Sequence, residues 1–221
     1  MRPETWAIAR FTVTMALLAT ALVLPPAIAV GWVLARRDFR GKTLLETIVS
    51  LPLVLPPVAS GLMLLWLFGR RSPVGQLLDA VGIQVIFTWK AVVIAMMVIS
   101  FPLVARSVRA GIEQVDRRFE HIAATLGAGP FRIVRTITLP LASRGIIAGA
   151  ILGFSRALGE FGATIMIAGA IPGQTQTLSV GIYTLVETGR EDAAWSLLAI
   201  SATLAFAAIY LSNRFAERKA I

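Results

Sequence analysis

The chain of 221 residues contains no cysteine, and its single histidine is His121. The absence of cysteine excludes disulfide bonds, thiolate metal sites and thiol nucleophiles. One histidine cannot form a histidine metal cluster or a catalytic pair with a second histidine, and a solvated helix residue is its expected identity. The sequence offers no catalytic constellation, so we expect a chain that is not an enzyme and that binds no metal or cofactor itself.

Charged residues are also scarce, at 15% of the chain, whereas hydrophobic residues make up 57%. An ordinary soluble domain has about a quarter of its residues charged. Three stretches without any charged residue are each long enough to cross a bilayer, which takes about 20 apolar residues. They are residues 11–35, 47–69 and 193–212. A soluble core of three such helices would lack the polar surface to cover it, and we therefore predict an all-α integral membrane protein.

Two further stretches complete a prediction of about five transmembrane helices in a single transmembrane domain, residues 1–221. The third span carries Lys90 near one end, from which its ammonium group can reach the interface. The fourth carries Arg156 and Glu160 near its middle, and neither flanking half is long enough to cross alone. The predicted spans are about 9–35, 46–69, 85–106, 144–168 and 193–212. Five spans place the two termini on opposite sides of the membrane.

The net charge of +9 would point to nucleic acid in a soluble protein. In a membrane protein the position of the basic residues relative to the spans is what matters, because cytoplasmic loops carry the excess of Lys and Arg. Fourteen of the 21 Lys and Arg residues lie in the first connection, the third connection and the C-terminal tail. Five lie in the N-terminal segment and in the second and fourth connections, and the other two lie inside spans. We therefore predict that the N-terminus is outside and the C-terminus cytoplasmic, without a nucleic-acid partner.

Proline is concentrated in the predicted spans. The sequence VLPP occurs at residues 23–26 and again at 54–57, and Pro52 and Pro102 lie in spans as well. We expect proline to break several spans, either as ordinary kinks or as part of a transport pathway. Residues 168–186 are uncharged but punctuated by glycine and proline, and we expect a re-entrant or surface-lying external segment there, not a sixth span.

The third connection, residues 106–144, is the only polar stretch long enough to hold structure of its own. Asp116 can cap the start of a helix and Gly127 can close its end. Between them, an apolar face recurs at helical spacing through Phe119, Ile122, Ala123 and Leu126. Such a helix can rest on a membrane surface or dock in a groove of a partner, and periodicity alone does not choose between them.

The segment EHIAATLGAGPFRIVRTITLPL in this connection resembles the signature loop of ATP-binding-cassette (ABC) importer permeases. It has a short helix, a glycine, nine intervening residues and then Ile-x-Leu-Pro. The resemblance implies a cytoplasmic coupling helix that sits in a cleft of the ATPase subunit. The residues that it places in this coupling loop are Phe119, Glu120, His121, Ala123, Ala124, Gly127, Ile137, Leu139 and Pro140. The sequence departs from the family at His121 and Ile122, which replace its usual glutamate and first alanine, although Glu120 lies one residue away.

Two other segments, SLPLVLPPVASG and RALGEFGATIMIAGAIPGQTQTLSVGIYTLVETG, are similar to the permeases of molybdate importers, so that the resemblance spans nearly the whole chain. Sulfate and thiosulfate permeases share an Ala-Leu-Gly-Glu stretch and are the alternative. The resemblance implies the type I ABC importer permease fold in a bacterial inner membrane, and import of molybdate, with tungstate as a further possible substrate. The implied partners are a second copy of the chain, a cytoplasmic ABC ATPase dimer that holds ATP and Mg²⁺, and a periplasmic or extracellular oxyanion-binding protein.

Arg156 and Glu160 stand four residues apart and can pair along one helix face. Two charges at membrane depth are interpreted either as a pair that braces helix against helix or as part of an anion pathway. Gly41-Lys42-Thr43 is similar to the end of a phosphate-binding loop, but Arg36 occupies the position of its first glycine, so we expect no ATP site in this chain. A secondary transporter is the alternative from another class, and it would normally be longer, with inverted halves.

Overall fold

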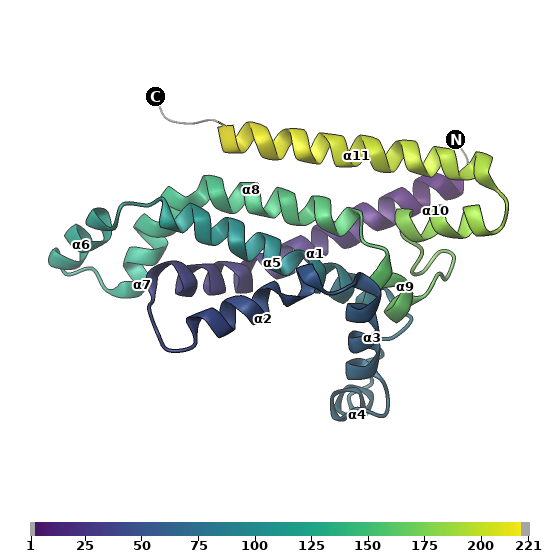
Figure 1. The fold of residues 1–221 in the computed structure, drawn as a ribbon, viewed down its shortest axis with the longest axis horizontal. Coiled ribbons are helices and arrows are strands. Elements are labelled where there is room, and N and C mark those ends of the chain that lie inside the picture. The colour runs from purple at the N-terminus through teal and green to yellow at the C-terminus, as the bar shows by residue number, and fades with distance from the viewer. Residues whose placement is uncertain (1–2, 218–221) are drawn as a thin grey trace.

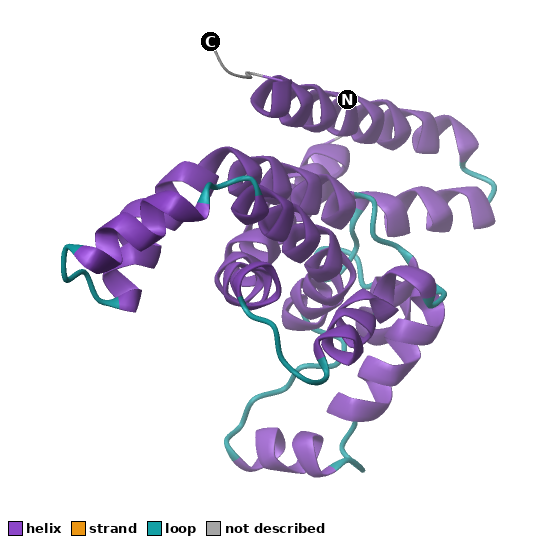
Figure 2. Ribbon diagram, turned by 60° about the vertical axis from the view of Figure 1, so that its left-hand side comes forward, coloured by secondary structure: helices purple, strands orange, loops and turns teal. Residues whose placement is uncertain are grey.

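The computed structural model describes residues 3–217, and within that range the chain is helical, without a strand (Figures 1 and 2). The long helices lie roughly side by side along one axis of the molecule (Figure 1). The segments are α1 (Pro3–Arg36), α2 (Lys42–Val54), α3 (Pro57–Phe68), α4 (Pro73–Ala80), α5 (Trp89–Glu113), α6 (Arg117–Thr125), α7 (Pro130–Ile133), the π-helix η1 (Val134–Thr138), α8 (Leu139–Leu158), α9 (Gly162–Ala168), α10 (Leu178–Glu187) and α11 (Glu191–Glu217). The predicted all-α class is confirmed.

Among the described residues, four helices are long and apolar enough to cross a membrane, and α2 with α3 makes a fifth crossing if this bent pair counts as one. The four are Glu4–Arg36, Trp89–Glu113, Pro130–Leu158 and Glu191–Arg214. Helix α1 has 34 residues, and its length of about 51 Å exceeds the roughly 30 Å of a hydrocarbon core. The ends of α1 therefore reach beyond the lipid tails.

Helix α5 is the centre of the bundle, where it packs against α1, α2, α8 and α9. Its sequence is apolar on nearly every face, which is typical of a helix surrounded by other helices. Side chains of α5 that are almost completely buried include Ala91, Val92, Met96, Ile99, Val104, Val108 and Ile112. Helix α11, by contrast, lies on the outside of the bundle along α8 and α10 (Figure 1).

Helices α5 and α8 approach each other so closely that their backbones touch. Gly145, Gly149 and Gly153 recur every fourth residue and line one face of α8. A Cβ atom on Gly145 would lie 2.6 Å from the Cα of Gly111 on α5, and one on Gly149 would lie 2.8 Å from the Cβ of Ser107. Small residues at this spacing let membrane helices pack by van der Waals contact, since lipid supplies no hydrophobic drive between helices.

Most prolines in the predicted spans lie inside helices that continue through them. They are Pro25, Pro26, Pro52 and Pro102. The expectation that several spans are broken is therefore wrong for α1 and α5. Buried side chains such as Val23 and Ala27 pack on either side of the double proline in α1, and this packing keeps the helix continuous despite the missing N–H groups.

The break forms only at the second VLPP sequence. Leu55 has an extended backbone (φ −65°, ψ 139°), as expected for a residue that precedes proline. Helices α2 and α3 are bent by 110° across it, and α3 and α4 project away from the long axis (Figure 1). Helix α9 supports α3 at close range, because a Cβ on Gly61 would lie 2.7 Å from the Cα of Ala163.

The segment predicted to be re-entrant or surface-lying contains α10, a helix of 10 residues that packs on α11. Its length is too short for a crossing of about 20 residues. This agrees with the expectation that the segment is not a sixth span.

Candidate functional site

The first part of the candidate site is α6, which lies at one end of the molecule beyond the bundle (Figure 1). As predicted, the Asp116 side chain caps the helix by accepting a hydrogen bond from the Arg118 N–H at 2.9 Å. Gly127 closes it with a left-handed φ of +83°. The N–H of Gly127 donates to the Ala124 carbonyl and that of Ala128 to the Ala123 carbonyl, a Schellman motif. The helix therefore has rigid ends.

The apolar face of α6 has no partner within the described part of the chain. Phe119, Ile122 and Leu126 are 54%, 57% and 83% exposed, and Phe131 at the start of α7 is 78% exposed. We call these four side chains the apolar cap. Large apolar side chains gathered at a polar end of a membrane protein are typical of a protein–protein contact.

Glu120 points inward from α6, opposite to the apolar cap. Its carboxylate pairs with the guanidinium of Arg36 at the end of α1, with Nη2 3.0 Å and Nε 3.1 Å from Oε1. The same oxygen accepts a hydrogen bond of 2.7 Å from the Thr138 hydroxyl of η1. Arg36 also donates to the Val115 carbonyl at 2.9 Å. The side chains of Arg36 and Glu120 are only 7% and 16% exposed, so this cluster joins α1, α6 and η1 through charge-assisted bonds.

The other residues of the predicted loop are divided between α6 and the helical segment that follows it. Ala123 and Ala124 lie on α6, His121 is exposed on it, and Ile137 lies in the π-helix η1. Leu139 and Pro140 lie where the π-helix η1 passes into α8. Residues 130–158 are helical without interruption. Helix α8 therefore continues through η1 and α7 back to Pro130, and a short turn joins it to the end of α6 at Thr125.

Arg156 and Glu160 lie where the predicted fourth span, residues 144–168, divides in two. Helix α8 ends at Leu158, and α9 begins at Gly162, so Glu160 stands in the break and not within a helix. Its Oε2 pairs with Arg156 Nη1 at 3.0 Å, and its Oε1 accepts from the Ala163 N–H at 2.8 Å. At 1% exposure, this carboxylate links the last turn of α8 to the first turn of α9.

The replacement Glu160→Gln should lower both complex yield and transport. The amide oxygen can still accept from Ala163, but the amide NH₂ would face the Arg156 guanidinium, and a hydrogen bond to a charged group is worth about 1.5–3 kcal/mol. Uptake and the yield of purified complex would be compared with those of Glu191→Gln, an exposed carboxylate at the start of α11. Wild-type values for both quantities in Glu160→Gln would contradict the bracing and the pathway interpretation alike.

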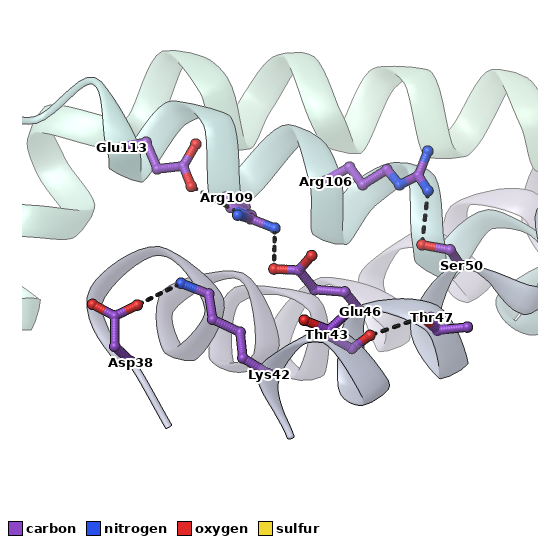
Figure 3. A network of polar contacts seen from close by, with 9 residues as sticks. All are labelled: Asp38, Lys42, Thr43, Glu46, Thr47, Ser50, Arg106, Arg109 and Glu113. Carbon is purple, nitrogen blue, oxygen red and sulfur yellow. Dashed lines mark hydrogen bonds and ion pairs between the residues drawn. The ribbon is translucent and has the colours of Figure 1, made fainter. Parts of the chain in front are cut away.

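A second polar cluster joins α2 to α5 near the end of the molecule that holds α6 (Figure 3). Arg109 pairs with Glu46 through Nη1 and with Glu113 through Nε, each at 2.7 Å. Arg106 donates to the Ser50 hydroxyl at 2.7 Å. Lys42, the first residue of α2, hydrogen-bonds Asp38 in the preceding loop at 2.9 Å, and this contact lowers the pKa of that exposed carboxyl.

Arg36, Thr138, and the α2–α5 cluster are not apparent as functional residues in the sequence. Arg36 and Glu120 are 84 residues apart, and no local pattern joins them. The polar face of α2 does have a signal, since Thr43, Glu46, Thr47 and Ser50 recur at helical spacing. The glycines at every fourth position of α8 are also visible, although their partner helix is not.

The family described as "Binding-protein-dependent transport system inner membrane component" matches residues 27–220. The chain is 45% identical over 217 residues to "Molybdenum transport system permease protein ModB" of Escherichia coli (strain K12), covering 97% of this chain and 94% of that protein. It is 37% identical over 169 residues to "Sulfate transport system permease protein CysW" of Synechococcus elongatus, with 76% of this chain and 59% of that protein covered.

Solved structures share the fold. The crystal structure of a bacterial alginate ABC transporter, in complex with an alginate pentasaccharide-bound periplasmic protein, contains a chain that superposes with a TM-score of 0.74. The two chains are 16% identical, and the match covers 99% of this chain and 80% of that one. The predicted type I ABC importer permease fold is thereby confirmed.

Proposed function

The chain belongs to the family of binding-protein-dependent transport system inner membrane components, and from this membership and the site described above we propose that it forms the membrane pathway of an ATP-driven molybdate importer. It is a permease subunit of an ABC transporter. The substrate rests on the relatives that carry molybdenum-transport names, of which the Escherichia coli protein aligns over nearly its whole length.

The apolar cap carries the coupling part of the proposal. Phe119, Ile122 and Leu126 are exposed on a rigidly closed helix that stands beyond the bundle, and Phe131 is exposed at the start of α7. We propose that they insert into a cleft of a cytoplasmic ATPase subunit. Glu120 lies on the inner side of α6 and holds the helix in place, because its carboxylate is bonded to Arg36 and cannot face the ATPase at the same time. The matching loop residues Gly127, Ile137, Leu139 and Pro140 fix where α6 ends and how the chain continues through η1 into α8.

The proposed assembly has two copies of this chain and an ABC ATPase dimer, which binds ATP and Mg²⁺. An oxyanion-binding protein delivers the substrate from outside, and lipid surrounds the remaining faces. Among the described residues no group of three or more histidine, aspartate or glutamate side chains is placed to hold a metal ion. The proposal places nucleotide and Mg²⁺ on the ATPase dimer.

The proposed orientation has the N-terminus outside and the C-terminus in the cytoplasm. The end of α1 at Arg36 and the end of α5 at Glu113 lie toward α6, while the start of α11 lies toward the opposite end (Figure 1). Basic residues gather toward α6, as the positive-inside rule requires of a cytoplasmic face. Because the chain lacks cysteine, a single introduced thiol at Arg40 or at Arg190 can be labelled from either side to test this.

In the proposed mechanism, ATP closes the ATPase dimer and draws the two α6 helices together. The Arg36–Glu120–Thr138 cluster passes this movement to α1 and to η1, which continues into α8. The spans then turn from inward-facing to outward-facing and accept the anion. Hydrolysis reverses the movement and releases the anion to the cytoplasm.

Sulfate or thiosulfate is the second candidate substrate, favoured by the sulfate permease relative at 37% identity. That match covers a smaller part of both chains than the molybdenum-transport match does. A single assay distinguishes the two. The complex is reconstituted in vesicles with its ATPase and binding protein, and uptake of molybdate and of sulfate is measured side by side.

We expect ATP-dependent uptake of molybdate that excess tungstate suppresses more strongly than sulfate does. Uptake of sulfate alone would transfer the function to the alternative. Transport without ATP, and without an ATPase that co-purifies under gentle conditions, would overturn the importer assignment in favour of a secondary transporter.

A further inference from the structure

A pocket of about 680 Å³ opens between α2, α5 and the end of α1. One face of α2 lines it with the hydroxyl groups of Thr43, Thr47 and Ser50, which stand four and three residues apart. Helix α5 contributes two guanidinium groups, Arg106 and Arg109 (Figure 3). Such a mixture of hydroxyls and arginines is unusual beside spans that are otherwise apolar.

The two arginines of the pocket differ in their partners. Arg109 is held between Glu46 and Glu113 at 2.7 Å from each, so its charge is neutralised locally. Arg106 has one polar partner among the described residues, the hydroxyl of Ser50. The carboxylate of Glu46 is the one acidic group that lines the pocket, and Arg109 occupies it. The guanidinium of Arg106 therefore keeps an unneutralised charge and free donors that face the pocket.

A brace between two helices would not require this arrangement, since a carboxylate opposite Arg106 would hold α2 more firmly than a hydroxyl does. A guanidinium fork beside a hydroxyl donor is suited to a tetrahedral oxyanion. The fork binds two oxygens side by side, and the Ser50 hydroxyl, which accepts from Arg106, can donate to a third. The Thr47 hydroxyl lines the pocket but already donates to the Thr43 carbonyl at 2.8 Å. A serine hydroxyl adds a donor without adding a charge that would hold the anion too tightly for release.

The pocket lies beside α2, the helix that leads into the 110° bend, and Leu34 and Arg109 line it close to the ends of α1 and α5. We propose that Arg106 and Ser50 form an anion subsite at the cytoplasmic mouth of the permease, which takes a doubly charged tetrahedral oxyanion of the molybdate or sulfate kind as it leaves. This inference rests on the proposed function. It adds a site in the permease itself to the selection made by a separate binding protein.

The experiment uses the absence of cysteine in this chain. Thr47→Cys places one thiol in the pocket, and Thr136→Cys places a control thiol on the exposed surface of η1, outside the pocket. The complex with its ATPase is reconstituted in vesicles of phosphatidylcholine alone, so that no anionic lipid can supply the phosphate. Modification of this chain by a thiol reagent added to the cytoplasmic face is followed by mass spectrometry, with and without sodium molybdate.

We expect molybdate to slow the modification of Thr47→Cys but not of Thr136→Cys, whereas chloride at the same ionic strength has no effect. Adding Arg106→Gln to Thr47→Cys should raise the molybdate concentration for half-protection at least about tenfold, because a bidentate charged contact is lost. Arg40→Gln removes the same charge from the neighbouring loop and should leave the protection unchanged. If the Arg106→Gln complex does not assemble, Arg106→Lys, which keeps the charge but loses the fork, replaces it with the same expected direction.

Equal rates with and without molybdate at Thr47→Cys would overturn the subsite, as would equal protection at Thr136→Cys or full protection with Arg106→Gln. If protection is seen in the phosphatidylcholine vesicles but is lost in vesicles that contain anionic lipid, the pocket is assigned to a lipid phosphate in the membrane. That result would also overturn the proposal. Uptake is measured in the same vesicles made with the wild-type chain. Normal uptake without protection rejects the subsite alone, whereas no oxyanion uptake rejects the proposed function.

Discussion

Replacing Gly145 with leucine is expected to abolish assembly of the permease. The Cβ atom of any residue at this position would lie 2.6 Å from the Cα of Gly111 and 3.3 Å from its backbone nitrogen. Backbone atoms cannot rotate away as the end of a side chain can. Helices α5 and α8 would have to separate along their crossing, and α5 contacts most of the other spans.

The size of the effect should follow the size of the added side chain. Gly145→Ala adds one carbon at the point of contact, and overpacking of this kind costs about 1–3 kcal/mol. Gly145→Leu forces several more atoms between the two backbones and should leave no monodisperse complex in detergent. Size-exclusion chromatography and the apparent melting temperature of the purified complex measure both variants.

Gly129→Leu is the matched control. Gly129 has an ordinary extended backbone (φ −69°, ψ 160°), and a Cβ atom there would meet nothing within 4 Å. The same glycine-to-leucine change should therefore leave yield and melting temperature near wild type. A monodisperse Gly145→Leu complex with wild-type thermal stability would refute the close contact between α5 and α8.

The spans are the part of the fold that the sequence predicts best, because a bilayer tolerates few charges over the length of a crossing. Long uncharged runs therefore mark α1 and α11 without reference to any partner. The ends of α6 are predictable for a similar reason, since Asp116 and Gly127 act on their own neighbouring backbone groups. These features depend on local chemistry alone.

Helix breaks and distant contacts depend on tertiary structure and are predicted less well. Pro25 and Pro26 do not interrupt α1, whereas α8 ends at Leu158 within an Ala-Leu-Gly-Glu stretch that contains no proline. The carboxylate of Glu160 stabilises that break by accepting from the first turn of α9. Neither outcome follows from proline and glycine content, because packing on α5 and α3 decides which helix can continue.

The candidate site shows the same division. The sequence predicts which residues of α6 form an apolar face, and the structure leaves that face exposed. It does not predict that Glu120 turns away toward Arg36, because the two residues are brought together only when α1 and α5 pack side by side. The family resemblance places a glutamate near this position without stating which way it points.

Replacing Arg36 with alanine is expected to uncouple ATP hydrolysis from uptake. The change leaves the Glu120 carboxylate, 16% exposed, without its guanidinium partner, and removing one member of a buried ion pair costs about 3–5 kcal/mol. It also removes the hydrogen bond to the Val115 carbonyl in the turn before α6. Helix α6 would keep its exposed apolar face and still dock, but its attachment to the end of α1 would be reduced to the 3.3 Å hydrogen bond from Arg117 to the Ala35 carbonyl.

The measurement is the number of molybdate ions taken up per ATP hydrolysed in reconstituted vesicles. In Arg36→Ala this ratio should fall severalfold while basal ATPase activity persists. In Glu120→Gln the ratio should fall less, because the amide oxygen can still accept from the Thr138 hydroxyl. Arg37→Ala is the control, since Arg37 stacks over Trp32 at 5.5 Å and makes no ion pair with Glu120. If Arg36→Ala does not assemble, Glu120→Gln decides by the same ratio. An unchanged ratio in an intact Arg36→Ala complex would mean that force reaches the bundle through the other connections of α6, which include the Arg117 hydrogen bond to Ala35 and the chain that continues through η1 into α8.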